Sequence, residues 1–414
     1  MTGKALDGIR IIEFTDFEGA YCGRLLADLG AEVIKVEPPG GGHQRHTPPF
    51  YSKLPAPDNS IAFWVHNTSK KSVVIDLESA DGQSEAKQLI LSADAVIEDN
   101  PVGWMAARGL GYDAIHAAKP SLVYVSITGF GQTGPHAGYA YTDIVGQAMG
   151  GIMTLAGDPA DPPNQLYGNQ SDVSASIQAA QGAMLALLYA EATREGQLVD
   201  VSAQESLSMS QETAMMYWDF QKHNRTRTGS SGALAIALPG LGEYEAADGH
   251  VFLFVPAPAG AEFPVLVDWM RERGMQGQLD DEPYKSLCDN LNYRFLTSIA
   301  GDPARLAATM KDMQVIDEQL RQFVKSMPAV EMYEEGQRRR LLVGLVSTPR
   351  DIATNRQLRA RNWFETIDFG DGVEVEFPGA PYRLSETPAQ ISHPPRLGEH
   401  SREVLAGLEV GGTL

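Results

Sequence analysis

The sequence predicts an α/β protein with a doubly wound, Rossmann-like large domain and a smaller α+β domain. Short apolar strands alternate with amphipathic helices through the first half of the chain, as in parallel β-α-β units. After residue 222 the composition shifts towards Arg, Thr, Gly and Ser, and strand-like segments return near Val343. We therefore expect the N-terminal part of a large domain over 1–222, a small domain over 223–335, and a return to the large domain over 336–414.

The elements of the large domain are predicted from the spacing of their apolar residues. Strands are expected at 7–15, 31–37, 72–77, 95–97, 122–128 and 198–202, and helices at 21–29, 83–92, 111–118, 143–153 and 173–194. In the second half, residues 242–256 alternate like a hairpin and 262–340 are mostly helical. Ligands of doubly wound sheets bind at the carboxyl ends of the strands, so the loops after these strands are candidate binding segments.

Composition narrows the class of function. The 414 residues carry a formal net charge of −20, which argues against nucleic acid and anionic membranes as partners. Cys22 and Cys288 are the two cysteines, which are too few for a disulfide framework or a zinc site, and no Asp, Glu or His cluster has metal-ligand spacing. The first turn lacks a dinucleotide fingerprint, and no apolar run reaches the roughly 18 residues of a membrane span. We expect a cytoplasmic protein without a metal.

One aspartate stands out at the start of the predicted helix over 173–194. Ser171 and Asp172 follow a small-residue turn and precede a run whose apolar residues share one helical face. A short acidic side chain there can cap the unpaired N–H groups of the first turn, and the helix dipole favours its charge. The same carboxylate could instead be a nucleophile that is held ionised where a substrate can approach. These residues alone favour the cap.

Several blocks, taken in order, resemble the family III CoA-transferases, the group of formyl-CoA transferase and carnitine CoA-transferase. The blocks span nearly the whole chain and match least over 223–330. They are LDGIR at 6–10, RLLADLGAEVIKVE at 24–37, KKSVVIDL at 70–77, VSITGFGQTGP at 125–135, GQLVDVS at 196–202 and PRLGEHSREVL at 395–405. Each block is weak evidence by itself, whereas the ordered set is specific.

The resemblance implies that Asp172 is the nucleophile of a CoA-transferase. Such an enzyme transfers CoA from an acyl-CoA donor to a carboxylic acid acceptor through a covalent aspartyl-CoA thioester, with no permanently bound cofactor. The resemblance also implies an interlocked homodimer and a glycine loop over the site, loosely at 256–260. It implies CoA contacts at Phe17, Glu18, Ile75, Asp76, Leu77, Asp99, Asn100, Tyr141, Thr142 and Asp143.

The chain departs from the family pattern where basic residues are expected. Pro38 follows the second strand in place of a basic residue, and Glu78 stands where the family sometimes has one. The phosphates of CoA would then need other cations, for which Arg45, Lys71 and Arg108 are the candidates.

Two other functions stay open. α-Methylacyl-CoA racemases share the fold, but their catalytic histidine corresponds to Thr142 and their glutamate falls near Pro258. Without that acid and base, proton exchange at the α-carbon lacks an agent. A non-catalytic CoA-binding subunit of a hetero-oligomer is the third possibility, and the presence of Asp172 argues against it. No residue identifies the acyl donor or the acceptor acid.

Overall fold

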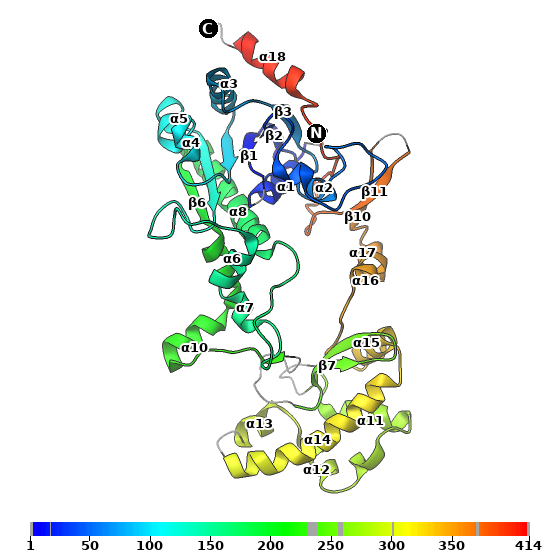
Figure 1. Cartoon of the computed structure of the whole chain (residues 1–414). Coiled ribbons are helices and arrows are strands. Elements are labelled where there is room, and N and C mark those ends of the chain that lie inside the picture. The colour runs from blue at the N-terminus through cyan, green and yellow to red at the C-terminus, as the bar shows by residue number, and fades with distance from the viewer. Residues whose placement is uncertain are drawn as a thin grey trace. The chain divides into compact units, whose positions relative to one another are not determined.

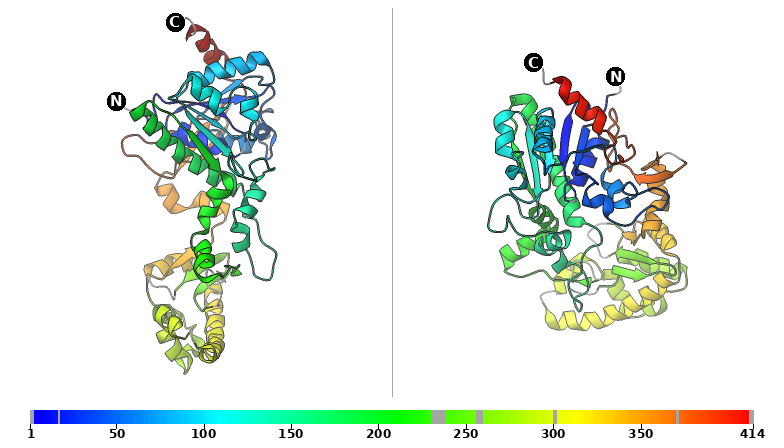
Figure 2. Two further views of the ribbon diagram at one scale, coloured as in Figure 1. Left: turned by 90° about the vertical axis from the view of Figure 1, so that its left-hand side faces the viewer. Right: turned by 45° about the horizontal axis from the view of Figure 1, so that its top comes forward.

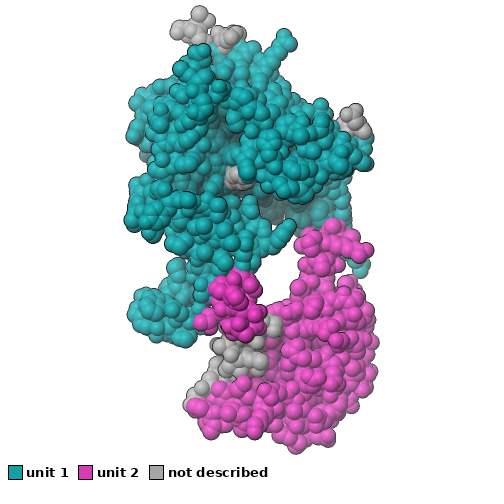
Figure 3. Space-filling view, viewed as in Figure 1, with its two compact units in different colours: residues 1–154, 165–225, 356–414 teal, residues 155–164, 226–355 magenta. Residues whose placement is uncertain are grey.

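The computed structural model describes residues 3–16, 18–229, 238–255, 260–299, 302–369 and 372–411 (Figure 1). The chain divides into two compact units, coloured separately in Figure 3. The first comprises Met1–Thr154, Gln165–Arg225 and Arg356–Leu414, and the second Leu155–Asn164 and Thr226–Asn355. Residues 336–355 group with the second unit, although the sequence suggested a return to the large domain from 336. The reason is β9, which pairs with β8 of the second unit.

A six-stranded parallel sheet forms the centre of the first unit. Its strands lie in the order β3-β2-β1-β4-β5-β6, which is the doubly wound order with a reversal between β1 and β4. The strands are β1 Arg10–Phe14, β2 Glu32–Glu37, β3 Lys71–Val74, β4 Ala95–Glu98, β5 Val123–Thr128 and β6 Leu198–Ser202. The predicted α/β class is therefore confirmed.

Helices cover both faces of this sheet (Figure 2). Successive strand residues point to opposite faces, so Ile11 packs in one core and Ile12 in the other. One core includes residues of α1 (Ala20–Asp28) and α8 (Gln170–Thr193). The other includes residues of α3 (Ala80–Leu91), α5 (Tyr112–Ala118) and α18 (Ser401–Gly411). Burial on both faces explains why the strands read as nearly continuous apolar runs.

Shorter elements complete the first unit. The two strands near the C-terminus pair antiparallel as a separate ribbon. The elements are η1 His43–His46, α2 Ile61–His66, α4 Trp104–Ala107, α6 Asp143–Met149, α9 Ala203–Ser208, η2 Met209–Gln211, α10 Thr213–Gln221, α17 Arg356–Ala360, β10 Phe364–Asp368 and β11 Glu374–Pro378. The helix α7 (Ile152–Leu155) ends at the first residue of the second unit.

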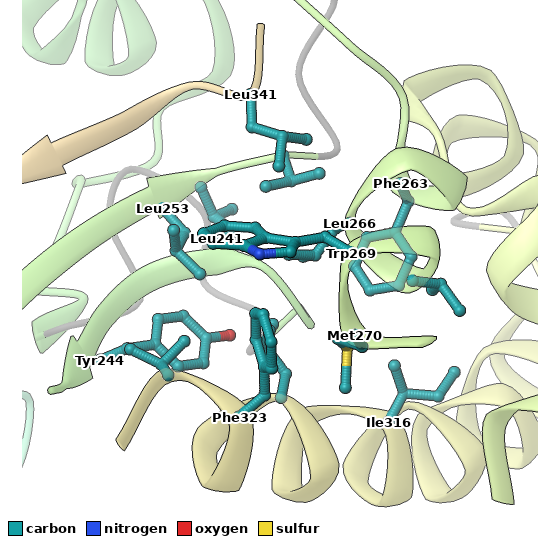
Figure 4. Packing of buried hydrophobic residues seen from close by; sticks show 14 of the residues in the cluster. Leu241, Tyr244, Leu253, Phe263, Leu266, Trp269, Met270, Ile316, Phe323 and Leu341 are labelled. Atoms are coloured by element: carbon teal, nitrogen blue, oxygen red, sulfur yellow. The ribbon is translucent and has the colours of Figure 1, made fainter. Parts of the chain in front are cut away.

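The second unit packs helices on a three-stranded antiparallel sheet. The expected hairpin is formed by β7 (Leu241–Glu245) and β8 (His250–Phe254), and β9 (Val343–Leu345) adds the third strand. Trp269 and Phe323 meet edge to face in the core (Figure 4). The helices are α11 Phe263–Glu272, η4 Gly277–Asp280, α12 Tyr284–Asn290, α13 Tyr293–Ile299, α14 Pro303–Lys325, α15 Ala329–Arg338 and α16 Pro349–Thr354.

The helix α8 is long and apolar enough to span a membrane, although the sequence suggested no run of that length. Almost half of its apolar window is buried within the first unit, where α8 packs against α1 and β5. Its buried face consists largely of alanines, including Ala175, Ala179 and Ala183. Small side chains allow the helix to approach the sheet closely, so burial in the core accounts for this composition.

Candidate active site

Asp172 lies in the first turn of α8, two residues after the helix begins at Gln170. The N-cap position belongs to Asn169, whose side chain makes no capping hydrogen bond. The first-turn amides are instead bound by Asp143 of α6, whose Oδ1 accepts from Ser171 N at 2.8 Å and from Asp172 N at 3.4 Å. The expectation that Asp172 caps the helix is therefore wrong. Because Asp143 satisfies these amides, the Asp172 carboxyl is left for other contacts.

The Asp172 carboxyl is held at one oxygen. The residue is only 6% exposed, and its Oδ1 accepts a hydrogen bond from the Tyr141 hydroxyl at 2.9 Å. The same hydroxyl lies 2.5 Å from Ser171 Oγ. Within the described part of the chain, no hydrogen bond engages Asp172 Oδ2. The hydrogen bond from Tyr141 orients the carboxyl through Oδ1 and leaves Oδ2 without a hydrogen bond from the described residues.

Burial changes the acidity of the carboxyls at this site. Burial, with the nearby charge of Asp143, raises the pKa of Asp172 to about 7, although the Tyr141 hydrogen bond acts in the opposite direction. Burial, with the charges of Asp99 and Asp172, raises the pKa of Glu18 to about 9. The sequence suggested that the helix would hold Asp172 ionised, whereas burial of the carboxyl opposes ionisation and raises its pKa. Between these two pKa values, the site holds one carboxylate beside one neutral carboxyl.

A buried glutamine of α6 organises the turn before Asp172. Gln147 is fully buried, and its Nε2 donates to Asp143 Oδ2 at 2.7 Å and to Leu166 O at 3.1 Å. Its Oε1 accepts from Leu166 N at 2.8 Å. Gly146 next to it leaves no space, because an added Cβ would lie 2.0 Å from Ser171 Oγ. The packing of α6 thus positions the start of α8.

A cavity of about 280 Å³ opens at the carboxyl ends of the neighbouring strands. Five of the residues predicted to contact CoA line it, namely Ile75, Asp76, Leu77, Asp99 and Asn100. Some of these side chains also fix the adjacent backbone. Asp99 accepts from Asp16 N at 2.9 Å and Gly19 N at 3.0 Å, and Asn100 Nδ2 donates to Phe14 O at 3.1 Å. The end of β4 therefore shapes the turn that follows β1.

That turn links the cavity to α8. Ser176 Oγ of α8 donates to the backbone oxygen of Glu18 at 2.6 Å. Burial raises the pKa of the Glu18 carboxyl, and the charges of Asp99 and Asp172 raise it further. Phe17 lies outside the described residues, as do residues 256–259 of the expected glycine loop. Thr142 takes the N-cap position of α6 without a side-chain capping bond. The structure thus gathers most of the predicted residues along one edge of the sheet.

The three candidate phosphate ligands have different surroundings. Lys71 is at the amino end of β3, where its Nζ binds Glu32 and Glu403, so the structure does not bring it to the cavity. Arg45 is buried and ion-paired with Glu37. Arg108 stacks over the ring of Trp104, which lines the cavity. Arg108 does not itself line the cavity, but its stacking partner Trp104 and its ion-pair partner Glu78 do.

Sequence reasoning missed two supporting roles in this region. Asp143 was expected to contact CoA, whereas it binds the first-turn amides of α8 and Gln147. Gln147 was not predicted at all. Their contact could have been predicted from the four-residue spacing of Asp143 and Gln147, which places both on one face of the helix.

Comparison with known proteins identifies the family and the fold of the chain. The model of the family described as CoA-transferase family III matches residues 6–401. The chain is 31% identical to succinyl-CoA:(R)-benzylsuccinate CoA-transferase subunit BbsE of Thauera aromatica, over 97% of this chain and 94% of that protein. It is 30% identical to succinate–glutarate CoA-transferase of Agrobacterium fabrum, over 98% and 96%. The structure is similar to a crystal structure of a CAIB/BAIF family protein from Brucella suis, with a TM-score of 0.82 and 25% identity over 98% and 100% of the two chains.

Proposed function

Because the chain belongs to CoA-transferase family III, we propose that it moves CoA from an acyl-CoA donor to a carboxylic acid acceptor through a covalent aspartyl-CoA thioester on Asp172. The proposal rests on the burial and the hydrogen bonding of the Asp172 carboxyl. It is buried, Tyr141 holds one of its oxygens, and the other has no hydrogen bond from the described residues. A carboxyl with these contacts is suited to nucleophilic attack rather than to helix capping.

The reaction needs no redox change and no net proton transfer. Asp172 Oδ2 attacks the thioester carbonyl, the C–S bond breaks, and CoA leaves as a thiolate while a mixed anhydride forms. The thiolate then attacks the aspartyl carbon of the anhydride, which releases the donor's free carboxylate and leaves the aspartyl-CoA thioester. The acceptor carboxylate attacks the carbonyl carbon of this thioester, the C–S bond breaks, and CoA leaves again as a thiolate while a second anhydride forms. The thiolate finally attacks the acceptor's acyl carbon, which restores the Asp172 carboxylate.

The surroundings of Asp172 support these steps physically. A buried carboxylate has a weak hydration shell, so less water must be removed before it attacks. The N-terminal end of α8 carries partial positive charge, which favours the anionic form of the nucleophile and the oxyanion that develops beside it. The 6% exposure of Asp172 also limits the approach of water to the reactive anhydride.

CoA is proposed to lie along the carboxyl edge of the sheet. The cavity lined by Ile75–Leu77, Asp99 and Asn100 would hold the nucleotide end, and the thioester would reach Glu18, Tyr141 and Asp172. A neutral Glu18 carboxyl can donate a hydrogen bond to a carboxylate or thioester oxygen, which an ionised one cannot. This orientation places the reactive end of the substrate at the start of α8.

A dimer with an interlocked fold is also part of the proposal. Exposed apolar side chains on α8 and α10 support it, because such patches mark contact surfaces. They are Ile177, Met184, Leu185, Leu188 and Tyr189 of α8, and Met215, Met216, Trp218 and Phe220 of α10. A second copy of this chain is the proposed partner. Two relatives are named as subunits, so a different chain is the alternative that a test must distinguish.

Succinyl-CoA is the donor to test first, because the name of the Thauera aromatica relative and those of several other relatives include it. The name of the Agrobacterium fabrum relative includes succinate. The protein is incubated with succinyl-CoA and a panel of dicarboxylic and aryl acids, and new CoA esters are detected by mass spectrometry. We expect at least one acid to become its CoA ester in proportion to succinate released. Loss of an α-proton label from a 2-methylacyl-CoA, without transfer to any acid from any donor, would contradict the proposal and favour a racemase.

A further inference from the structure

An ion pair stands at the edge of the cavity proposed for the CoA nucleotide. Arg108 Nη2 donates to Glu78 Oε1 at 2.5 Å, and the guanidinium carbon lies 3.7 Å from the centre of the Trp104 ring. Glu78 and Trp104 both line the cavity. A guanidinium that is stacked on an indole is held in one orientation, so its outer N–H groups point in a fixed direction.

The ion pair between Arg108 and Glu78 is weak enough for a ligand to replace Glu78. The Glu78 side chain is 75% exposed and that of Arg108 is 17% exposed. An ion pair with one solvated partner is weak, because water screens it and the flexible acid gains freedom on release. Arg108 Nε is also buried without a hydrogen-bond partner in the described part of the chain. A phosphate group could therefore gain more from Arg108 than the carboxylate does.

Other cations near the cavity are already bound in the interior. Lys35 Nζ lies 3.0 Å from Glu13 Oε1 and is almost fully buried. Arg45 donates to both carboxylate oxygens of Glu37, at 2.6 and 2.8 Å. Exchanging these partners for a phosphate would take an ion-pair partner away from a buried carboxylate, either Glu13 or Glu37, which is costly. Of Lys35, Arg45 and Arg108, Arg108 therefore loses the least stabilisation when a phosphate replaces its carboxylate partner.

We propose that Glu78 sets the affinity for the substrate's phosphate groups by competing with them for Arg108. This inference rests on the proposed CoA-transferase function and assigns a specificity role to a residue that departs from the family pattern. A phosphate of the CoA nucleotide displaces the Glu78 carboxylate and takes its hydrogen bond from Arg108. Glu78 also places a negative charge beside the incoming phosphate, so it weakens binding twice. The phosphate can be the 3′-phosphate or the diphosphate of CoA.

Binding is measured by titration calorimetry with CoA, dephospho-CoA and pantetheine at one salt concentration. We expect Glu78→Gln to bind CoA about three- to tenfold more tightly than the unchanged protein, and to bind pantetheine equally. A gain that persists with dephospho-CoA identifies the diphosphate as the ligand of Arg108, and a gain that disappears identifies the 3′-phosphate. Glu85→Gln on α3 is the matched control, because Glu85 lines a different hollow beside α18. It removes the same charge and should leave CoA binding unchanged.

A double substitution tests whether the effect passes through Arg108. Arg108→Gln should weaken CoA binding, and adding Glu78→Gln to it should give much less than the gain seen in the presence of Arg108. The inference is overturned if Glu78→Gln leaves CoA binding unchanged, if pantetheine gains equally, or if no variant binds CoA. These measurements need no turnover. Intact binding effects without CoA transfer would contradict only the proposed reaction, and transfer without a Glu78 effect would contradict only this inference.

Discussion

Asp172 and Glu18 differ in acidity, and the proposed reaction uses this difference. Burial places the pKa of Asp172 at about 7 and that of Glu18 at about 9. Pairs of acids whose surroundings separate their pKa values are typical of sites that need one ionised and one neutral group. The proposed nucleophile, Asp172, must be ionised to react, so we expect its reactive form to accumulate above about pH 7, while Glu18 stays neutral up to about pH 9.

We therefore expect a bell-shaped dependence of kcat/KM on pH. The rate should rise as pH increases through about 7, when Asp172 loses its proton, and fall as pH increases through about 9, when Glu18 becomes charged. Glu18→Gln keeps a neutral hydrogen-bond donor at all pH values, so the descending limb should disappear while the ascending limb remains. Initial rates corrected for thioester hydrolysis test this. A descending limb that survives in the variant would show that another group causes it.

Tyr141 is a positioning residue in this account, because its hydroxyl orients the Asp172 carboxyl at 2.9 Å. Tyr141→Phe removes a hydrogen bond that lowers the pKa of Asp172. The ascending limb should therefore move to higher pH, and kcat/KM at pH 7 should fall about tenfold, equivalent to roughly 1.4 kcal/mol. Tyr139→Phe is the control, since Tyr139 is exposed and stacks on His136. A loss of rate without a shift of the limb would indicate a purely structural role.

The contact between α6 and α8 is the element on which the site depends. Glycine at position 146 allows the two helices to approach, because an added Cβ would lie 2.0 Å from Ser171 Oγ and 2.5 Å from the Tyr141 hydroxyl. The Asp143 carboxylate then reaches the first-turn amides of α8. Close approach of the helices and capping by Asp143 thus depend on the same small residue.

Gly146→Ala should disrupt this contact even though alanine favours helices by about 1 kcal/mol over glycine. We expect a loss of roughly 1–3 kcal/mol in the free energy of unfolding and a fall of at least about tenfold in kcat. Gly138→Ala provides the comparison, because a Cβ there meets nothing within 4 Å. Chemical denaturation and initial rates measure both effects. Equal behaviour of the two variants would contradict the tight-contact account.

At the scale of the whole molecule, the sequence predicted the periodic elements well and the long-range polar contacts poorly. The strand and helix spacing from 95 to 202 corresponds closely to β4, α5, β5, α8 and β6. Lys70 is an example of a polar contact that the sequence did not predict. It precedes β3 in a Lys-Lys pair that could be a solvated pair or a phosphate anchor, yet Lys70 Nζ is buried at 2.8 Å from Glu13 Oε2. Only tertiary packing brings Glu13 beside it, and no local pattern contains that information.

In the candidate site too, some features could be predicted from the sequence, whereas others depend on tertiary packing. Alternation of strands and helices predicted a ligand site at the carboxyl ends of the strands, and the structure has a cavity there. The hydrogen bonds from the α8 amides to Asp143, and those between Gln147 and Leu166, depend on the packing of α6 against α8. Arg45 resembled a free cation in a glycine-rich loop, but its partners Glu37, Asp58 and Pro395 come from three separate segments. Such contacts follow from the fold rather than from nearby residues.

The proposed interlocked dimer makes a kinetic prediction. Threaded chains cannot separate without unfolding, so dilution to nanomolar concentration should yield no monomer, and two differently tagged dimers should not exchange subunits under native conditions. Mass photometry and native mass spectrometry of the mixed dimers measure this. Exchange within minutes, or a monomer in equilibrium with the dimer, would contradict the interlocked arrangement. Co-purification with a different chain in fixed ratio would favour a hetero-oligomer.

The central claim is that Asp172 carries CoA covalently, and trapping that intermediate tests it most directly. The protein is mixed with succinyl-CoA without an acceptor, treated with hydroxylamine or borohydride, digested and analysed by mass spectrometry. We expect hydroxylamine to convert Asp172 to its hydroxamate and borohydride to reduce it to the alcohol, with neither change in Asp172→Asn or without donor. Robust CoA transfer by a protein whose Asp172 stays unmodified in these experiments, or equal transfer by Asp172→Asn, would contradict the account.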